Sequence, residues 1–362
     1  FIGKFEALVE TRKRVAVATF HVAEKSHSGN LISANTAQVL GLITLHVKNV
    51  VSGKKGNLDS ILNKHSKVFT SLGKLKKHQI TLNIDETVTP KAQPQRRIPY
   101  HIRDRVKSAI EILEQDDVIE KVPESQPTPW VSPIVAVPKK DGGVRICVNM
   151  RQANTAIKRV RYPIPTVEDI TQELTGAKWF SKLDLSLAYH QLELSESSRF
   201  VTTFSTNGGL FRHKRLNYET NAATEISQHT LQQQLHGLRD VRNIADDIIV
   251  YGKTGQEHDE NLDNCLQRLY DRGLRLNQSK CKFHSNTLEF FGQIFSEAGT
   301  QLDPKRVTVL QNAPVRQNVH DVCSLLGMAN YSSSYIPDFA TITAPLHELT
   351  QKNTKFKWTR IH

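Results

Sequence analysis

Two adjacent carboxylates inside an apolar run restrict the fold of this chain more than any other feature. Asp246 and Asp247 follow Ile244-Ala245 and precede Ile248-Ile249-Val250-Tyr251. A buried charge is unfavourable unless the carboxylate takes up a proton, pairs with a cation or binds a metal ion. The fold therefore has to bring a compensating partner close to this segment.

A second segment of the same kind lies upstream, at Trp179-Phe180-Ser181-Lys182-Leu183-Asp184-Leu185. Its alternation of apolar and polar residues predicts a strand that carries Asp184. On neighbouring strands, Asp184, Asp246 and Asp247 would bind Mg²⁺, which prefers oxygen ligands and keeps positions open for substrate phosphates. The alternative is a solvated turn or a calcium loop, against which the apolar flanks argue.

Such a site suits phosphoryl transfer by two metal ions. We expect Asp184 and Asp246 to hold two Mg²⁺ ions, with Mn²⁺ as a substitute, and Asp247 to support them. One ion would activate a primer 3′-hydroxyl, and the other would neutralise the triphosphate and the leaving group.

Charge and composition favour a nucleic-acid partner. The 48 Lys and Arg residues exceed the 36 Asp and Glu residues, which gives a net charge of +12. This surplus suits a polyanion, although a merely soluble basic protein is the alternative. The four cysteines form no CxxC pair, so neither a zinc module nor a disulfide framework is indicated. Without a run of roughly 20 apolar residues or a signal pattern, we expect an intracellular, cytoplasmic protein with no membrane partner, with access to the nucleus left open.

The order of predicted elements indicates an α+β fold. Residues 1–45 are expected to form short strands followed by a helix-like run at 35–43, and residues 46–95 a connector with little buried structure. The expected elements after that are a helix at 101–116, hairpins at 134–148 and 200–216, helices at 221–238 and 257–272, paired strands at 274–295, and helices at 304–313 and 319–331. Strands and hairpins alternating with helices predict an antiparallel sheet backed by helices.

Basic and aromatic residues near these strands are further candidates. Lys139, Lys140 and Arg145 lie on or beside the first hairpin, where they would bind phosphate, unless the hairpin is an ordinary solvated one. Tyr189 follows Asp184 by five residues. It would stack under the sugar of a nucleotide and clash with a 2′-hydroxyl, although a single tyrosine more often belongs to the core.

Several motifs in one order resemble the reverse transcriptase of gypsy-class LTR retrotransposon polyproteins over residues 96–300. They are Thr128-Pro129-Trp130-Val131-Ser132-Pro133, Lys139-Lys140-Asp141-Gly142-Gly143-Val144-Arg145, Arg151-Gln152-Ala153-Asn154, Tyr162-Pro163-Ile164-Pro165, Phe180-Ser181-Lys182-Leu183-Asp184-Leu185 and Ala245-Asp246-Asp247. Residues 326–331, 336–339 and 356–358 resemble the segment between thumb and RNase H in the same polyproteins. Residues 1–45 are similar to the end of the preceding retropepsin domain.

The resemblance implies a right-hand polymerase with fingers, palm and thumb. Fingers and palm would occupy residues 96–300, a thumb-like helical region 301–345, and the start of a connection to a missing RNase H domain 346–362. Such an enzyme copies primed RNA or DNA templates with deoxynucleoside triphosphates and Mg²⁺. Its oligomeric state stays open.

The same resemblance assigns individual residues. It implies that Asp184, Asp246 and Asp247 are the catalytic and metal-binding triad. Nucleotide binding falls to Lys139, Lys140, Arg145, Tyr189 and Tyr218, with Tyr189 discriminating the sugar. Primer positioning falls to Phe290, Phe291 and Gly292.

The sequence also departs from the family pattern. Where the family has Pro-Phe-Gly and then small residues, this chain has Asn217-Tyr218-Glu219-Thr220. Glu219 replaces a glycine and adds bulk and negative charge beside a triphosphate. Asn149, Ile244 and Ser227 depart from an aspartate, an aromatic residue and a phenylalanine. Two hypotheses therefore stay open, a working polymerase and an inactive remnant that only binds nucleic acid. A third is an unrelated structural protein whose aspartates lie in a solvated turn.

Overall fold

The computed structural model describes residues 3–10, 15–22, 55–138, 142–313, 316–352, 354 and 356–359. The chain divides into two compact units, Phe1–Gly53 and Lys54–His362. In the first unit, β1 (Gly3–Glu10) and β2 (Val15–Val22) form an antiparallel pair. The helix-like run expected at 35–43 lies outside the described residues.

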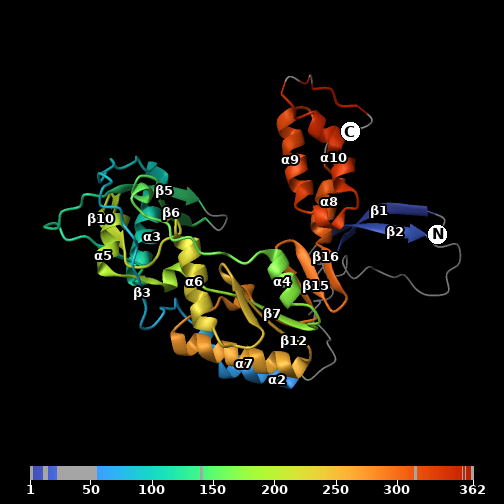
Figure 1. Ribbon diagram of the computed structural model, residues 1–362, viewed down its shortest axis with the longest axis horizontal. Coiled ribbons are helices and arrows are strands. Elements are labelled where there is room, and N and C mark those ends of the chain that lie inside the picture. Colours follow the sequence, from blue (N-terminus) through green and yellow to red (C-terminus); the bar gives the residue numbers. More distant parts are fainter. Residues whose placement is uncertain are drawn as a thin grey trace. The chain divides into compact units, whose positions relative to one another are not determined.

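A four-stranded antiparallel sheet in the second unit carries the aspartates (Figure 1). Its strand order is β11 (Val241–Ile244), β12 (Asp247–Gly252), β7 (Trp179–Asp184) and β13 (Lys282–Ser285). In the register of β12 with β7, Asp247 lies opposite Asp184. The pleat therefore places the side chains of Asp184, Lys182 and Phe180 on one face of β7, and those of Leu183 and Ser181 on the other.

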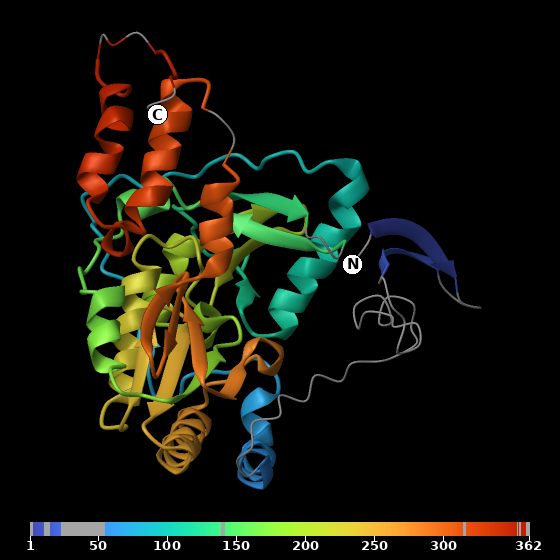
Figure 2. The ribbon, with the colours of Figure 1, turned by 90° about the vertical axis from the view of Figure 1, so that its right-hand side faces the viewer.

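Helices cover the face of this sheet to which Leu183 and Ser181 belong. The helices are α6 (Ala223–Leu235), α7 (Gly255–Arg272) and α2 (Lys55–Lys64), and α2 and α7 lie side by side in both views (Figures 1 and 2). The helix expected at 257–272 is α7, and one side of it is buried, at His258, Leu262, Cys265, Leu266 and Leu269. Thr254 caps the start of α7, and Gly273 ends it at a φ of 80°.

The segment before the first long helix is built into the core. Residues 55–82 form α2, a 3-10 turn at Ser66–Phe69 and β3 (Gln79–Ile80), which pairs with β8 (Glu193–Leu194). The expectation of little buried structure is therefore wrong here. The buried residues are Ile61, Val68, Leu75, Ile80 and Leu82. Leu58, Ile61 and Leu62 have helical spacing, and Ile80 and Leu82 alternate with polar residues, but both patterns are short and the prediction overlooked them.

A second sheet has the order β4 (Ile119–Lys121), β10 (Gly209–His213), β9 (Phe204–Thr206), β5 (Ser132–Pro138) and β6 (Val144–Val148). Both hairpins that the sequence predicts are present in it, β5 with β6 and β9 with β10. The helix expected at 101–116 is α3 (Arg103–Gln115), which packs against β6. Two short helices, α4 (Val167–Glu173) and α5 (Glu196–Arg199), lie in the connections.

The last part of the chain is a small sheet followed by helices. The sheet consists of β14 (Thr287–Phe290), β15 (Gln293–Ser296) and β16 (Gly299–Leu302). The expected helices are α8 (Pro304–Gln311) and α9 (Val319–Asn330), and α10 (Phe339–Glu348) lies beside α9 (Figure 2). Among the described residues, no helix combines the length and the apolar character needed to cross a bilayer.

Candidate active site

The three aspartates come together at one end of two paired strands. Asp184 is the last residue of β7, and its Cα partner Asp247 is the first residue of β12. Asp246 precedes it in the tight turn between β11 and β12, and the Asp246 carbonyl accepts a hydrogen bond from the Leu185 backbone N–H at 3.3 Å. The tertiary pairing therefore joins two segments that lie about sixty residues apart in the sequence.

A buried glutamine forms hydrogen bonds that fix the turn at Asp246. Ala245 has a φ of 49°, in the left-handed region, and its N–H donates to Gln228 Oε1 at 2.7 Å. Gln228 is fully buried on α6, and its Nε2 donates to the carbonyl of Asn243 at 3.0 Å. The alternative that the aspartates lie in a turn is therefore correct for the backbone. Contacts with the core fix this turn, so it is not simply a solvated turn. A turn and a metal site do not exclude each other.

Two carboxylate oxygens of the site lack a hydrogen bond. Asp184 Oδ1 and Asp246 Oδ1 are buried, and neither has a hydrogen-bond partner among the described residues. Burial raises the pKa of Asp246, and the neighbouring charges of Asp247 and Asp184 raise it further. Burial also raises the pKa of Asp184, an effect that Lys280 opposes and Asp247 reinforces. Hard oxygen donors that repel one another and accept no hydrogen bond fit a divalent cation such as Mg²⁺.

Two lysines neutralise the aspartates. Lys182 Nζ lies 2.8 Å from Asp247 Oδ2, and Lys280 Nζ lies 3.6 Å from Asp184 Oδ1. Sequence reasoning missed both lysines and also Gln228. The spacing of Lys182 two residues before Asp184 on one strand would have placed both on the same face. No local signal marks Lys280 or Gln228, because both arrive through tertiary packing.

The aspartates do not form the tightest group of potential metal ligands. Among the described residues, the one group of three whose ligand atoms all lie within 4.8 Å of one another is His258, Asp259 and His284. Asp184 and Asp247 are instead each engaged with a lysine. Those ion pairs would have to open for the carboxylates to share an ion.

Two tyrosines pack against each other next to Asp246. The rings of Tyr189 and Tyr218 lie 4.6 Å apart between centroids. Tyr189 is 8% exposed and shares a hydrogen bond with Thr224, which agrees with the alternative that it belongs to the core. Tyr218 is 43% exposed. Burial and then the charge of Asp246 raise the pKa of Tyr218. Tyr218 is therefore the accessible ring of the pair, and Tyr189 is the buried ring packed against it.

The residues expected to contact the triphosphate are only partly described. Arg145 is exposed on β6 and is close enough to Tyr218 to lower its pKa, whereas Lys139 and Lys140 lie outside the described residues. Glu219 accepts a hydrogen bond from Asn217 Nδ2 at 3.3 Å, and its carboxyl also interacts with the Cys147 thiol on β6. Burial raises the pKa of Glu219. The departure from glycine thus places an acidic group against Cys147, which lies two residues after Arg145 on β6.

The expected primer-positioning residues form the turn between β14 and β15. Phe290 is buried, and its ring centroid lies 5.2 Å from Lys182 Nζ. Because Lys182 and Asp184 share one face of β7, Phe290 belongs to the face of the sheet that carries Asp184. Phe291 is 46% exposed, and Gly292 has a φ of 72° at a point where a Cβ would overlap Arg306. Tyr331, the residue that follows α9, donates a hydrogen bond to the Phe291 carbonyl. This turn is therefore tied to the helices that follow it.

Comparison with known proteins assigns the region that contains this site. Residues 137–295 match the family described as reverse transcriptase (RNA-dependent DNA polymerase). They are a reverse transcriptase domain. The expected relation to gypsy-class Pol polyproteins is confirmed, and these residues include Asp184, Asp246 and Asp247. The reverse transcriptase family generally uses divalent metal ions.

The relatives of this domain are retrotransposon polyproteins. The chain is 28% identical over 345 residues to the retrovirus-related Pol polyprotein from transposon 412 and 29% identical over 340 residues to that from transposon gypsy, both of Drosophila melanogaster. These alignments cover 91% of this chain but only 27% and 32% of the relatives. The Tf2-3 polyprotein of Schizosaccharomyces pombe is 29% identical over 229 residues, which are 63% of this chain and 17% of that protein.

Solved structures confirm the fold. The foamy viral protease-reverse transcriptase in complex with double-stranded DNA superposes with a TM-score of 0.75 at 20% identity, covering 99% of this chain and 66% of that one. Its complex with an RNA/DNA hybrid gives a TM-score of 0.73 at 20% identity, covering 99% and 50%. The expected right-hand polymerase fold is therefore present. The domain boundaries, including the retropepsin remnant at 1–45, stay predictions.

Proposed function

We propose that this domain is an RNA-directed DNA polymerase that adds deoxynucleotides to a primer 3′-hydroxyl on an RNA or DNA template. The observation that carries the proposal is the pairing of Asp184 with Asp247 beside Asp246, with buried carboxylate oxygens that lack a hydrogen bond. The proposal is also supported by the nucleic acids in the complexes of the structural neighbours. It covers this segment, which is a fraction of the length of its relatives.

Each residue of the site has a defined task in this proposal. Asp184 and Asp246 would hold two Mg²⁺ ions, which supply charge neutralisation for the attacking and leaving oxygens. Lys182 orients Asp247 at the edge of the site. Tyr218, supported by Tyr189, would pack under the sugar and exclude a 2′-hydroxyl.

Arg145 would bind the triphosphate through its planar guanidinium, and the same role is proposed for Lys139 and Lys140. The turn at Phe290, Phe291 and Gly292 would place the primer end, because Phe290 lies on the same face of the sheet as the aspartates. These positive side chains and the metal ions would then together neutralise the negative charge on the reacting phosphate.

Primer extension tests the polymerase directly. The full chain is incubated with oligo(dT)-primed poly(rA), dTTP and either Mg²⁺ or Mn²⁺, and incorporated label is measured. We expect incorporation that Asp246→Asn lowers by about a hundredfold or more, a loss of the size seen when one group that stabilises the transition state is removed. Asp271→Asn, at an exposed position of α7, is the matched control. Absence of incorporation by the wild-type chain with either metal would refute the proposal.

The binding-only alternative rests on Glu219, whose acidic group interacts with Cys147, two residues after Arg145 on the strand expected to receive the triphosphate. An inactive remnant would bind primer-template and fail to extend it. It would also fail after Glu219→Gly, and this distinguishes a lost active site from one that is only weakened.

A further inference from the structure

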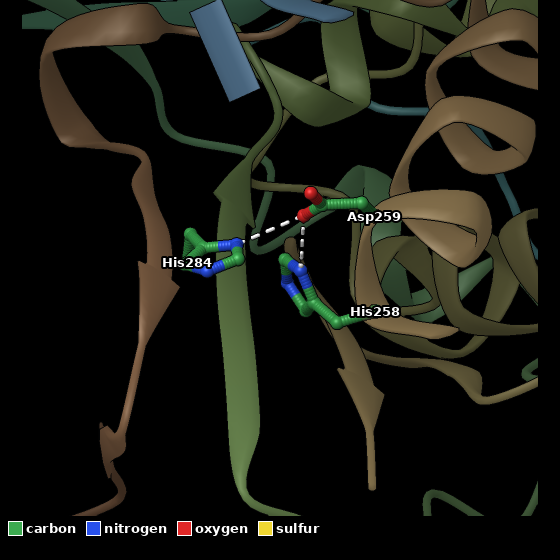
Figure 3. Close-up of side chains that lie close together, drawn as sticks. All are labelled: His258, Asp259 and His284. Atoms are coloured by element: carbon green, nitrogen blue, oxygen red, sulfur yellow. Dashed lines mark hydrogen bonds and ion pairs between the residues drawn. The ribbon is translucent and has the colours of Figure 1, made fainter. Parts of the chain in front are cut away.

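A second cluster of chemically competent side chains lies on the other face of the central sheet. His258 and Asp259 belong to the first turns of α7, and His284 belongs to β13 (Figure 3). Ser181 of β7 contacts this cluster. Ser181 is three residues before Asp184 on a pleated strand, so it points away from the face of the proposed polymerase site.

The three side chains converge on one point. Figure 3 shows both imidazoles turned toward the same carboxylate oxygen: His284 Nδ1 lies 2.8 Å and His258 Nδ1 lies 3.1 Å from Asp259 Oδ1. The two rings stand at 87° with their centroids 5.1 Å apart. His258 is fully buried, Asp259 is 5% exposed, and the side chain of His284 is 13% exposed. The cluster is thus enclosed, with a side open to solvent at His284.

We propose that His258, Asp259 and His284 bind a transition-metal ion of the zinc type. Two imidazole nitrogens and one carboxylate oxygen are a donor set that suits Zn²⁺ and not Mg²⁺, which prefers oxygen ligands. Three protein ligands leave one tetrahedral position for water. Such an ion would join α7 to β13, the strand that leads into the turn at Phe290.

The surroundings hold the ligands in the orientation that a metal ion requires. His258 Nε2 lies 2.8 Å from Ser181 Oγ. In the metal-bound state an Nε2–H would donate to that hydroxyl oxygen and leave the Nδ1 lone pair for the ion. Asn57 Nδ2 donates to Asp259 Oδ2 at 2.8 Å, so the other oxygen, Oδ1, faces the two imidazoles. Ser181 Oγ is itself fixed by the backbone N–H of His284 at 3.0 Å. Partners of this kind, which hold the second atom of each ligand, are typical of metal sites.

Binding requires no oxidant or further reactant. Without an ion, each Nδ1–H donates to Asp259 Oδ1. On binding, each neutral imidazole carries its proton on Nε2, and coordination bonds replace the two N–H···O hydrogen bonds. The opposing hypothesis is a cluster that remains hydrogen-bonded and never takes up metal.

Metal uptake by the full chain separates these hypotheses. The chelator-stripped protein is supplied with excess Mg²⁺ to occupy the aspartates. It is then titrated with Co²⁺, whose visible absorption reports tetrahedral nitrogen and oxygen ligands, and the zinc content after gel filtration is measured. We expect about one Zn²⁺ per chain and a melting temperature that rises with free Zn²⁺, because an ion that binds only the folded state stabilises it.

Three substitutions locate the ion. Asp259→Asn and His284→Gln should lose the Co²⁺ absorption and the bound zinc. Ser181→Ala should keep the ligands and weaken zinc binding about 10- to 100-fold, the usual effect of removing a partner of a ligating histidine. His229→Gln, at an exposed histidine of α6, is the matched control and should bind like the wild type. Wild-type protein without stoichiometric zinc, or His284→Gln protein with undiminished uptake, would overturn the proposal.

Discussion

At the scale of single residues, Glu219 stands where the family has a glycine, and it is the departure that most disfavours the proposed triphosphate binding. Its half-buried carboxyl interacts with Cys147, two residues after Arg145 on β6, where the triphosphate is expected to bind. We expect Glu219→Gly to raise primer extension about tenfold, a change of about 1.4 kcal/mol in the barrier, because a like charge near the triphosphate is removed. Glu219→Gln should give part of that gain by removing the charge alone. Steady-state incorporation rates measure both, and an unchanged or slower glycine variant would contradict this account of the site.

The aspartates make stability depend on pH in a defined direction. The pKa of Asp246 is raised in the folded protein, first by burial and then by Asp247 and Asp184, so the folded state holds its proton more tightly than the unfolded chain does. This contribution favours folding below the ordinary pKa and is lost as pH rises through the raised folded pKa. Removing the charge should therefore stabilise the protein at neutral pH.

We expect Asp246→Asn to raise the melting temperature at pH 7.5 without divalent ions by about 2–4 °C, the shift that about 1 kcal/mol produces in a domain of 150–250 residues. The gain should shrink as the pH is lowered toward the ordinary aspartate pKa. Thermal denaturation across pH measures it, with Asp271→Asn as the control. A lower melting temperature for Asp246→Asn at pH 7.5 would show that its charge is fully compensated by its surroundings.

At the scale of elements, the β11–β12 turn depends on α6. Gln228→Ala would leave the Ala245 N–H and the Asn243 carbonyl without their partner. We expect a loss of about 1–3 kcal/mol per group left unsatisfied, together with slower primer extension, because Asp246 is the next residue. Urea denaturation and incorporation assays measure the two effects. Gln233→Ala, on the exposed side of the same helix, is the control, and equal losses in both variants would mean that helix content is responsible.

Element positions were largely predictable, because they follow from local patterns. The apolar residues of α7 recur at helical spacing, and Asn207-Gly208-Gly209 predicts the β9–β10 turn. The segment at 55–82 was missed, although Leu58, Ile61 and Leu62 have helical spacing and Ile80 and Leu82 alternate with polar residues. These patterns are short, and the surface that buries them is completed by α7 and β8, more than one hundred residues away.

At the scale of the whole molecule, net charge is the property that bears on partners. With a charge of +12, binding of primer-template should weaken steeply with salt, because lysines and arginines that neutralise phosphates release counterions. For about six phosphate contacts, we expect the affinity to fall about 10³-fold between about 50 and 200 mM salt. Fluorescence anisotropy measures it, with an uncharged morpholino duplex as the control. An affinity that does not change with salt would reject both the polymerase and the binding-only hypotheses.

The sequence by itself determined which segments become strands and helices and which residues carry charge inside apolar runs. Its motifs also indicated the family, since the chemistry of Asp184, Asp246 and Asp247 can be recognised from neighbours along the chain. These properties are local, because alternation and helical spacing act over a few residues.

Only the tertiary structure decided what those charges meet. Lys182 and Lys280 reach the aspartates, Gln228 holds their turn, and His258, Asp259 and His284 converge behind them. Each of these contacts joins side chains brought together by strand register and helix packing. The free energy that fixes register and packing comes from burying the whole apolar core. These contacts therefore cannot be predicted from any short segment of the sequence.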